Sequence, residues 1–244
     1  MHPDVYLEMA HAEANHWWFV GRRAILASLI SRLSLPDEAR ILEIGSGTGG
    51  NLAMLSAFGT ISALELDSGA RTIAAEKTGG RFDIRAGVCP GDIPFAPANF
   101  DLVCLFDVLE HIEDDVATLI AVRKLLAAGG RVFLTVPAYA WLRSTHDDRL
   151  DHKRRYSIAE LREKLAASGL RIEKISYFNT LLFPLVALGR LKDRLFKQST
   201  ATGTAIPSAP VNRFLSALFG TERFFLGTRN LPYGVSLLAV CRVQ

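Results

Sequence analysis

The stretch Arg40-Ile41-Leu42-Glu43-Ile44-Gly45-Ser46-Gly47-Thr48-Gly49-Gly50-Asn51-Leu52 decides the fold. Its apolar run at residues 41–44 predicts a buried strand interrupted by one carboxylate, and Leu52 opens an apolar pattern typical of a helix. Glycines between a strand and a helix N-terminus let the backbone turn sharply and approach a ligand closely. The stretch therefore predicts a nucleotide-cofactor cradle, without deciding which cofactor it holds.

The composition of the 244-residue chain fits a domain with one sizeable core, because 49% of the residues are hydrophobic. Residues 1–139 carry 11 Lys and Arg against 17 Asp and Glu, whereas residues 140–244 carry 17 against 8. This asymmetry favours an anionic substrate or a membrane surface on the C-terminal side. No nucleic-acid partner is expected, because there is no dense basic stripe or reading motif.

Three cysteines, Cys89, Cys104 and Cys241, stand in apolar contexts without metal-like spacing, which predicts buried free thiols in a reducing compartment. The N-terminus shows no basic segment followed by an apolar one, so no signal peptide is expected. The apolar run Leu181–Leu188 is too short to span a bilayer. These features predict a cytoplasmic protein.

Strands alternate with helices along the chain, which predicts right-handed β-α-β units and a doubly wound sheet. We expect an α/β fold with a seven-stranded, mostly parallel sheet and an antiparallel last strand. Strands are predicted at residues 41–44, 60–67, 82–87, 100–106, 131–136, 171–178 and 234–243, and helices at residues 6–33, 71–77, 114–127, 157–168, 181–197 and 211–219, with a further helix starting at Leu52.

Two helical segments are expected to flank this single domain, which spans residues 1–244: an N-terminal lid at 1–35 and a cap or insert at 180–230. The lid contains His16-Trp17-Trp18-Phe19, and adjacent Trp residues point to different sides of a helix. The lid either covers the core or closes Trp18 and Arg22 over the substrate. The insert, with its apolar helix and basic end, could hold a substrate tail, contact a membrane, pack a dimer or cover the sheet edge.

The glycine cluster satisfies the pattern G-x-G-x-x-G, so a dinucleotide reading is open. Glu43 precedes the first glycine and can face a cationic amino group. Glu65 ends the second predicted strand about twenty residues beyond the glycines, where it can accept hydrogen bonds from ribose hydroxyls.

Together with Phe100-Asp101-Leu102-Val103 and Val108-Leu109-Glu110-His111, these residues resemble class I S-adenosylmethionine-dependent methyltransferases of the small-molecule kind that includes quinone-biosynthesis enzymes. The resemblance implies a Rossmann-like methyltransferase fold and S-adenosyl-L-methionine as cofactor. It departs at Ala86-Gly87-Val88-Cys89, where many members carry an acid for adenine. The cofactor residues it implies are Glu43, Gly45, Ser46, Gly47, Gly49, Glu65, Leu66, Val88, Cys89, Phe106 and Asp107.

A narrower resemblance to one bacterial subgroup rests on the His-Trp-Trp-Phe start and on a His-Asp…His-x-Arg-Arg-Tyr signature at residues 146–156. That signature follows the fifth predicted strand, on the edge where open α/β sheets bind ligands. The candidates for catalysis are His111, His146, His152 and Tyr156, and those for substrate binding are Trp18, Arg22, Arg154 and Arg155. A solvated basic loop tied to Asp147, Asp148 and Asp151 is the alternative reading of the signature.

The cluster Asp107, Glu110 and His111 is similar to one associated with metal in quinone-ring O-methyltransferases. Since Glu110 and His111 are sequential, the three side chains need not converge, and no metal is predicted.

The resulting hypothesis is S-adenosylmethionine-dependent O-methylation of a small anionic or lipid-linked acceptor by a monomer or homodimer, with peripheral membrane contact left open. The alternatives are a nicotinamide-dependent oxidoreductase and a non-catalytic cofactor-binding module that contacts a membrane or a partner. The antiparallel last strand argues against the oxidoreductase.

Overall fold

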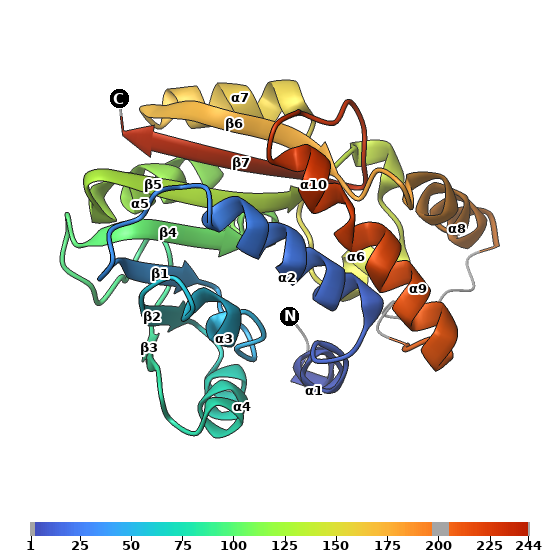
Figure 1. Cartoon of the computed structure of the whole chain (residues 1–244), viewed down its shortest axis with the longest axis horizontal. Coiled ribbons are helices and arrows are strands. Elements are labelled where there is room, and N and C mark those ends of the chain that lie inside the picture. The colour runs from blue at the N-terminus through green and yellow to red at the C-terminus, as the bar shows by residue number, and fades with distance from the viewer. Residues whose placement is uncertain (1–2, 197–204, 244) are drawn as a thin grey trace.

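The computed structural model describes residues 3–196 and 205–243 and contains a seven-stranded sheet in the order β3-β2-β1-β4-β5-β7-β6 (Figure 1). Neighbouring strands from β3 to β5 are parallel, and β7 is antiparallel to both β5 and β6. The predicted fold class is thereby confirmed. The strands are β1 (Arg40–Ile44), β2 (Thr60–Glu65), β3 (Asp83–Ala86), β4 (Phe100–Phe106), β5 (Leu126–Pro137), β6 (Leu170–Phe178) and β7 (Ser236–Val243).

Helices cover both faces of the sheet (Figure 1). They are α1 (Pro3–Ala12), α2 (Trp17–Ile30), α3 (Leu52–Leu55), α4 (Ser68–Thr78), α5 (Asp115–Leu125), α6 (Thr145–Arg149), α7 (Ile158–Ala167), α8 (Phe183–Phe196), α9 (Ala209–Gly220) and α10 (Glu222–Leu226), with short 3₁₀ turns at Leu109–His111 and Ala140–Leu142. In the part of the chain that the structure describes, no helix is long and apolar enough to cross a membrane.

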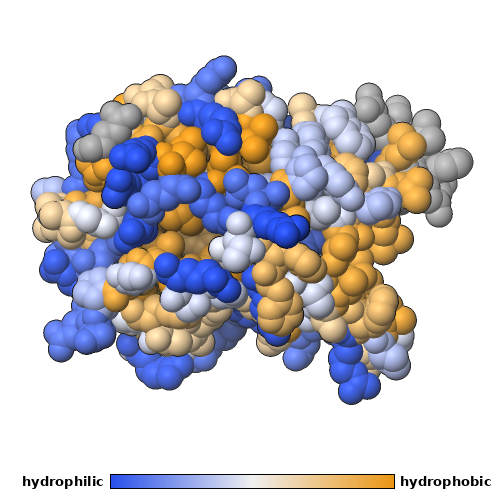
Figure 2. Space-filling model, turned by 45° about the horizontal axis from the view of Figure 1, so that its top comes forward, coloured by the Kyte–Doolittle hydropathy of each residue, from blue (hydrophilic) through white to orange (hydrophobic). Residues whose placement is uncertain are grey.

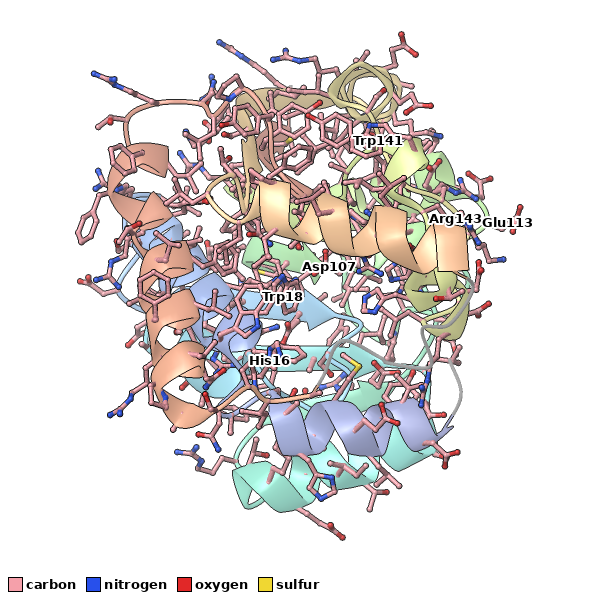
Figure 3. All side chains as sticks on the ribbon, turned by 90° about the vertical axis from the view of Figure 1, so that its right-hand side faces the viewer. His16, Trp18, Asp107, Glu113, Trp141 and Arg143 are labelled. Carbon is pink, nitrogen blue, oxygen red and sulfur yellow. The ribbon has the colours of Figure 1, made fainter. Side chains whose placement is uncertain are left out.

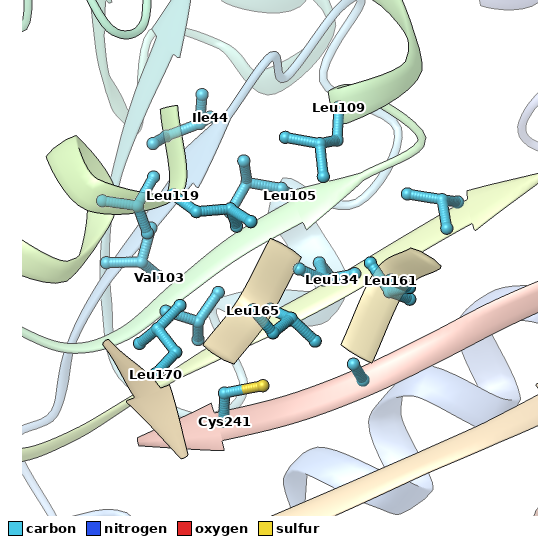
Figure 4. Close-up of a cluster of buried hydrophobic side chains, with 14 of the residues drawn as sticks. Ile44, Val103, Leu105, Leu109, Leu119, Leu134, Leu161, Leu165, Leu170 and Cys241 are labelled. Carbon is cyan, nitrogen blue, oxygen red and sulfur yellow. The ribbon is translucent and has the colours of Figure 1, made fainter. Parts of the chain in front are cut away.

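Strand β4 shows how the apolar pattern builds the two cores. Its side chains alternate between the sheet faces, as they must in a strand. Val103 and Leu105 join the cluster under α5 and α7, where Leu119 and Leu165 also lie (Figure 4). Leu102 and Cys104 join the opposite cluster under α2, α3, α9 and α10. A strand buried on both faces has no need of polar residues, which explains the nearly continuous apolar run.

Three expectations about the elements need correction. The N-terminal helix is not continuous but is divided into α1 and α2. His16 caps the start of α2, because its Nδ1 accepts a hydrogen bond from the Trp18 amide. A helix was expected to continue to residue 127, but strand β5 begins at Leu126. That residue pairs with Phe100 of β4, next to a bulge between Phe100 and Leu102. The helices α6 and α10 were not predicted. The expected linker at 199–210 and the end of the 181–197 helix fall partly on residues 197–204, which lie outside the described residues.

The sheet order reverses between β1 and β4, and the loops after β1, β2, β4 and β5 meet at the same edge. Ligands of open α/β sheets bind in the crevice at such a switch point. All four of these loops contribute residues to a single cavity. The cysteines lie away from it or in its wall, and Cys89, Cys104 and Cys241 are buried free thiols, as expected.

Candidate active site

A cavity of about 1090 Å³ lies at this edge, and Figure 3 shows Trp18 and Asp107 in the opening framed by α1, α8 and α9. Most of the residues predicted from the sequence meet there. They are Trp18, Arg22, Gly45, Ser46, Gly47, Glu65, Leu66, Val88, Cys89, Phe106, Asp107, His111, His146, His152 and Arg155. The predicted residues Glu43, Gly49, Arg154 and Tyr156 are not among the lining residues.

The glycine loop is built for close approach. Gly45 has φ +68°, and a Cβ on it would lie 2.6 Å from Cγ2 of Val108. Gly47 has φ +54°, and its amide donates to Oε2 of Glu65 at 2.8 Å. Side chains are disfavoured at both positions, so the loop presents bare backbone to the cavity. Gly49 instead packs towards α4, because a Cβ there would lie 3.1 Å from Cβ of Ala74.

Glu65 is held rigidly at the end of β2. Its Oε2 accepts from Gly47 and its Oε1 accepts from the amide of Asp67 at 2.9 Å, while the side chain is buried. A carboxylate oxygen has a second lone pair, so both oxygens can still accept hydrogen bonds from a diol. Asp67 itself caps α4 by accepting from the Ala70 amide, which gives this acid a structural use.

Glu43 lies behind the cavity wall. Its Oε1 accepts from Nδ2 of Asn51, a residue that does line the cavity, and its buried Oε2 has no hydrogen-bond partner. Burial raises the pKa of Glu43 to about 7, against the opposing hydrogen bond from Asn51. A buried carboxyl with an unused oxygen suits a cationic group brought next to it.

Val88 and Cys89 lie in the loop after β3 and form one part of the cavity wall. The family resemblance alone assigned them to the cofactor. Burial raises the pKa of the Cys89 thiol to about 12, so this group stays protonated and is not a nucleophile.

Arg22, which is buried, and Asp107, which is half-buried, form an ion pair at the cavity floor. Arg22 also donates to Oγ1 of Thr135 at 2.9 Å, and its guanidinium lies 4.9 Å from the centroid of the Trp18 ring and 5.5 Å from that of Phe106. Because its charge is already paired, Arg22 orders the floor and the two aromatic rings and does not offer a free cation to an anionic substrate.

Two histidines face each other on the opposite wall, with the rings of His111 and His152 4.8 Å apart. Nδ1 of His152 lies 2.9 Å from Oδ1 of Asp147. Asp147 also accepts from Nε of Arg155 at 2.7 Å and from the Ser144 amide at 2.9 Å. Burial would raise the pKa of Asp147, but the hydrogen bond from His152 and the charge of Arg155 hold it below its usual range.

An ionised Asp147 can only accept, so Nδ1 of His152 carries the proton and its Nε2 keeps a free lone pair. Burial, with a contribution from His152, lowers the pKa of His111 to about 4. Burial, with a contribution from Arg190, lowers the pKa of His146 to about 3. His111 and His146 are therefore neutral near pH 7.

Glu110 is fully buried in this wall, and neither of its carboxyl oxygens has a hydrogen-bond partner. Burial and the nearby charge of Asp107 raise the pKa of Glu110 well above its usual value. Among the described residues, Glu110, His111 and His152 bring one ligand atom each within 4.8 Å of one another and could hold a metal ion. Glu110 and His111 thus converge after all, but with His152 in place of Asp107.

Arg154 and Tyr156 are placed away from the cavity, which conflicts with their predicted contact with substrate. Arg154 binds Asp115 at 3.1 Å and the carbonyl of Glu113 at 2.9 Å. The hydroxyl of Tyr156 donates to Oδ2 of Asp115 at 3.0 Å, inside the core. Both side chains anchor the signature loop onto α5. The two arginines of the signature alternate in direction, so only Arg155 reaches the cavity wall.

Two acids that lie against the predicted histidines, Glu110 and Asp147, were not among the site residues predicted from the sequence. Glu110 was considered only as a metal ligand, and Asp147 was grouped with solvated acids. The only available signal was that both acids lie in loops at the ligand edge that also carry histidines, and an acid there can orient a histidine ring.

A family model described as a methyltransferase domain matches residues 19–175. A protein of Mycolicibacterium smegmatis named as a probable S-adenosylmethionine-dependent methyltransferase is 28% identical over 165 residues, 66% of this chain and 62% of that protein. A ubiquinone biosynthesis O-methyltransferase of Xanthomonas euvesicatoria is 33% identical over 143 residues, 53% of this chain and 59% of that protein. The match thus spans about three fifths of these curated relatives.

Solved structures share the fold. The YcgJ protein of Bacillus subtilis has a TM-score of 0.59 at 17% identity, with 90% of this chain and 98% of that chain covered. The geranyl diphosphate C-methyltransferase of Streptomyces coelicolor, solved with Mg²⁺, geranyl diphosphate and S-adenosylhomocysteine, has a TM-score of 0.60 at 14% identity, with 88% and 77% covered.

The residues around the cavity suit S-adenosylmethionine: a loop after β1 with glycines at two positions that disfavour side chains, a rigid carboxylate at the end of β2 and an unused buried carboxyl oxygen at Glu43. The family match covers well over half of the chain, and the sheet order agrees with it. The chain belongs to the methyltransferase-domain family.

Proposed function

We propose that the protein transfers a methyl group from S-adenosylmethionine to a hydroxyl group of a small, amphiphilic acceptor. The observation that carries the proposal is that His152, oriented by Asp147, lines the same cavity as the glycine loop and Glu65. A binding module would need the cofactor residues but not a buried, oriented base. The nicotinamide alternative is excluded by the family and by the antiparallel β7.

On the cofactor side, the chain's residues bind and orient. The backbone of Gly45 and Gly47 passes close to the methionine part, Glu65 accepts the two ribose hydroxyls, and Glu43 faces the amino group directly or through water. When bound, S-adenosylmethionine supplies an electrophilic sulfonium methyl, so the remaining task of the protein is to align and deprotonate a nucleophile.

On the acceptor side, Nε2 of His152 takes the hydroxyl proton as the nucleophile attacks. Asp147 holds the ring in the required tautomer and stabilises the imidazolium that forms, while Arg155 holds Asp147. Nε2 lies 3.9 Å from Oε1 of Glu110, a carboxyl oxygen without a partner. A neutral Glu110 can therefore hydrogen-bond the acceptor hydroxyl next to the base.

The cavity favours the lipid-linked form of the acceptor over the anionic one. Of the arginines predicted from the sequence, Arg22, Arg154 and Arg155 are all paired with carboxylates, so none of these three offers the bidentate grip that an anionic acceptor would need. The wall next to the floor is aromatic instead, with Trp17, Trp18, Phe19 and Phe106. The relatives named as ubiquinone biosynthesis O-methyltransferases act, by that name, in making a lipid-like quinone, which supports the same choice.

The proposal is tested by incubating the protein with fractionated cell extract and methyl-labelled S-adenosylmethionine, followed by mass spectrometry of the labelled product. We expect a labelled methyl ether in the lipid-extractable fraction, absent with His152→Ala. Labelling on nitrogen or carbon, or no labelling by a protein that binds S-adenosylhomocysteine, would contradict O-methylation.

A further inference from the structure

Helix α8 separates the cavity from solvent and is apolar on its outer side. Val186, Gly189 and Arg190 line the cavity. Leu185, Leu188 and Leu191 recur every three residues, as one stripe along a helix does, Leu181 lies in the turn just before the helix, and all four are exposed. Leu185 and Leu188 expose 60% and 67% of their surface. We call these four leucines the α8 face.

An exposed Trp extends this face. Trp141, in the 3₁₀ turn that contacts α8, is 56% exposed and lies 6.2 Å, ring to ring, from Phe183 at the start of the helix. Apolar residues gather at the right-hand end of the molecule in Figure 2, where α8 and α9 lie in Figure 1. Trp has an apolar body and a polar edge, which suits a boundary between water and hydrocarbon.

The sequence around the α8 face is basic. Residues 181–226 contain six Lys and Arg against two acids, Asp193 and Glu222. Glu222 does not reach the surface, because it is buried and accepts from the amides of Asn179, Thr180 and Leu181. An apolar stripe with basic residues nearby is the pattern of a helix that lies in the interface of an anionic bilayer.

A second copy of the chain is a less suitable occupant. In a two-fold dimer the same patch meets itself, so the segment 181–226, with six Lys and Arg against two acids, would meet a segment of the same net charge. An anionic lipid surface is complementary to both the leucines and the charge.

We propose that the α8 face docks on the surface of an anionic phospholipid bilayer and so brings the opening framed by α1, α8 and α9 next to the membrane. The docking goes beyond the proposed function, but its benefit to the protein rests on that function. An amphiphilic acceptor could move from the bilayer into the cavity past a single helix. The docking itself does not require that chemistry.

The test is sedimentation of the full chain with vesicles of phosphatidylcholine and phosphatidylglycerol at 70:30, compared with vesicles of phosphatidylcholine alone. We expect binding to the anionic vesicles that weakens in 0.5 M NaCl, because salt screens the basic residues. The double variant Leu185→Glu, Leu188→Glu should bind about tenfold or more weakly. The matched control is Val243→Glu, which places an acid at an exposed apolar position near the C-terminus, at the other end of the molecule from α8 (Figure 1).

Absence of vesicle binding by the unmodified chain, equal binding of the double variant, or equal binding to neutral vesicles would overturn the proposal. A dimer that dissociates in the double variant, seen by light scattering without vesicle binding, would assign the face to a second copy instead. S-adenosylhomocysteine affinity is measured on every variant. An affinity equal to that of the unmodified chain shows that the fold of a variant is intact. If neither the unmodified chain nor any variant binds S-adenosylhomocysteine while vesicle binding is retained, the proposed function is rejected but the docking is not.

Discussion

Nδ1 of His152 lies 2.9 Å from Oδ1 of Asp147, and both side chains are buried in the wall of the cavity. The pair joins the end of α6 to the loop that follows it, and Arg155 and the Ser144 amide hold the carboxylate in place. The histidine is thereby oriented before any ligand arrives, as a general base should be.

Replacing His152 with Ala should lower kcat about 10²- to 10⁴-fold, the usual contribution of a general base, while S-adenosylhomocysteine affinity stays unchanged. Asp147→Asn should lower kcat by about tenfold or more and alter its pH profile, because an amide does not enforce the same tautomer. Asp148→Asn is the matched control, since Asp148 is exposed and pairs with Arg143. Equal activity of the Asp147 and Asp148 variants would remove the pair from the mechanism.

Glu65→Ala should weaken S-adenosylhomocysteine binding about 10- to 100-fold, because two hydrogen bonds to a charged group are lost. The control is Glu76→Ala, an exposed acid on α4. Since Glu65 also holds the Gly47 amide, a second readout is needed. The unmodified protein should prefer S-adenosylhomocysteine to its 2′-deoxy analogue, and Glu65→Ala should bind both alike; a preference that survives the substitution would count against ribose recognition by Glu65.

The affinity for S-adenosylhomocysteine should rise with pH. Burial raises the pKa of Glu43 to about 7, so the free protein holds this carboxyl largely neutral below that pH. A bound ammonium group favours the carboxylate, and binding below pH 7 must first remove a proton. Calorimetry at pH 6 and pH 8 should show about tenfold tighter binding at pH 8. Glu43→Gln should flatten this dependence. A pH dependence equal in both proteins would mean that Glu43 does not face the amino group.

Chelation of divalent cations should leave turnover unchanged, because in the proposed mechanism Glu110 and His152 bind the acceptor hydroxyl and its proton, not a metal ion. The measurement compares initial rates before and after dialysis against EDTA, with Mg²⁺ or Zn²⁺ added back. Loss of activity that an added cation restores would show that Glu110, His111 and His152 hold a metal instead, and His152 could not then act as the base.

Local features of the sequence predicted most of the fold and the cofactor side. The glycine loop directly follows β1, and Glu65 is the last residue of β2. Each of these features is therefore defined by a short stretch of sequence at the end of a strand. The length and apolar run of β4 were likewise readable, because a strand covered on both faces has a simple composition.

The acceptor side depends on contacts between distant segments, and there sequence reasoning was less complete. Arg154, Arg155 and Tyr156 are adjacent, yet only Arg155 lines the cavity, since the other two side chains turn to Asp115 on α5. Glu110 is relevant to the acceptor side because it is buried near His152, which is 42 residues away in the sequence. Neither the direction of a loop side chain nor the burial of a carboxyl can be read from spacing alone.

The most direct test of the central claim is calorimetric titration of the folded protein with S-adenosylhomocysteine, with a nicotinamide dinucleotide as the competitor. We expect one-to-one binding of S-adenosylhomocysteine that the dinucleotide does not displace and that Glu65→Ala weakens. Absence of binding by the folded protein, or displacement by the dinucleotide, would contradict the central claim.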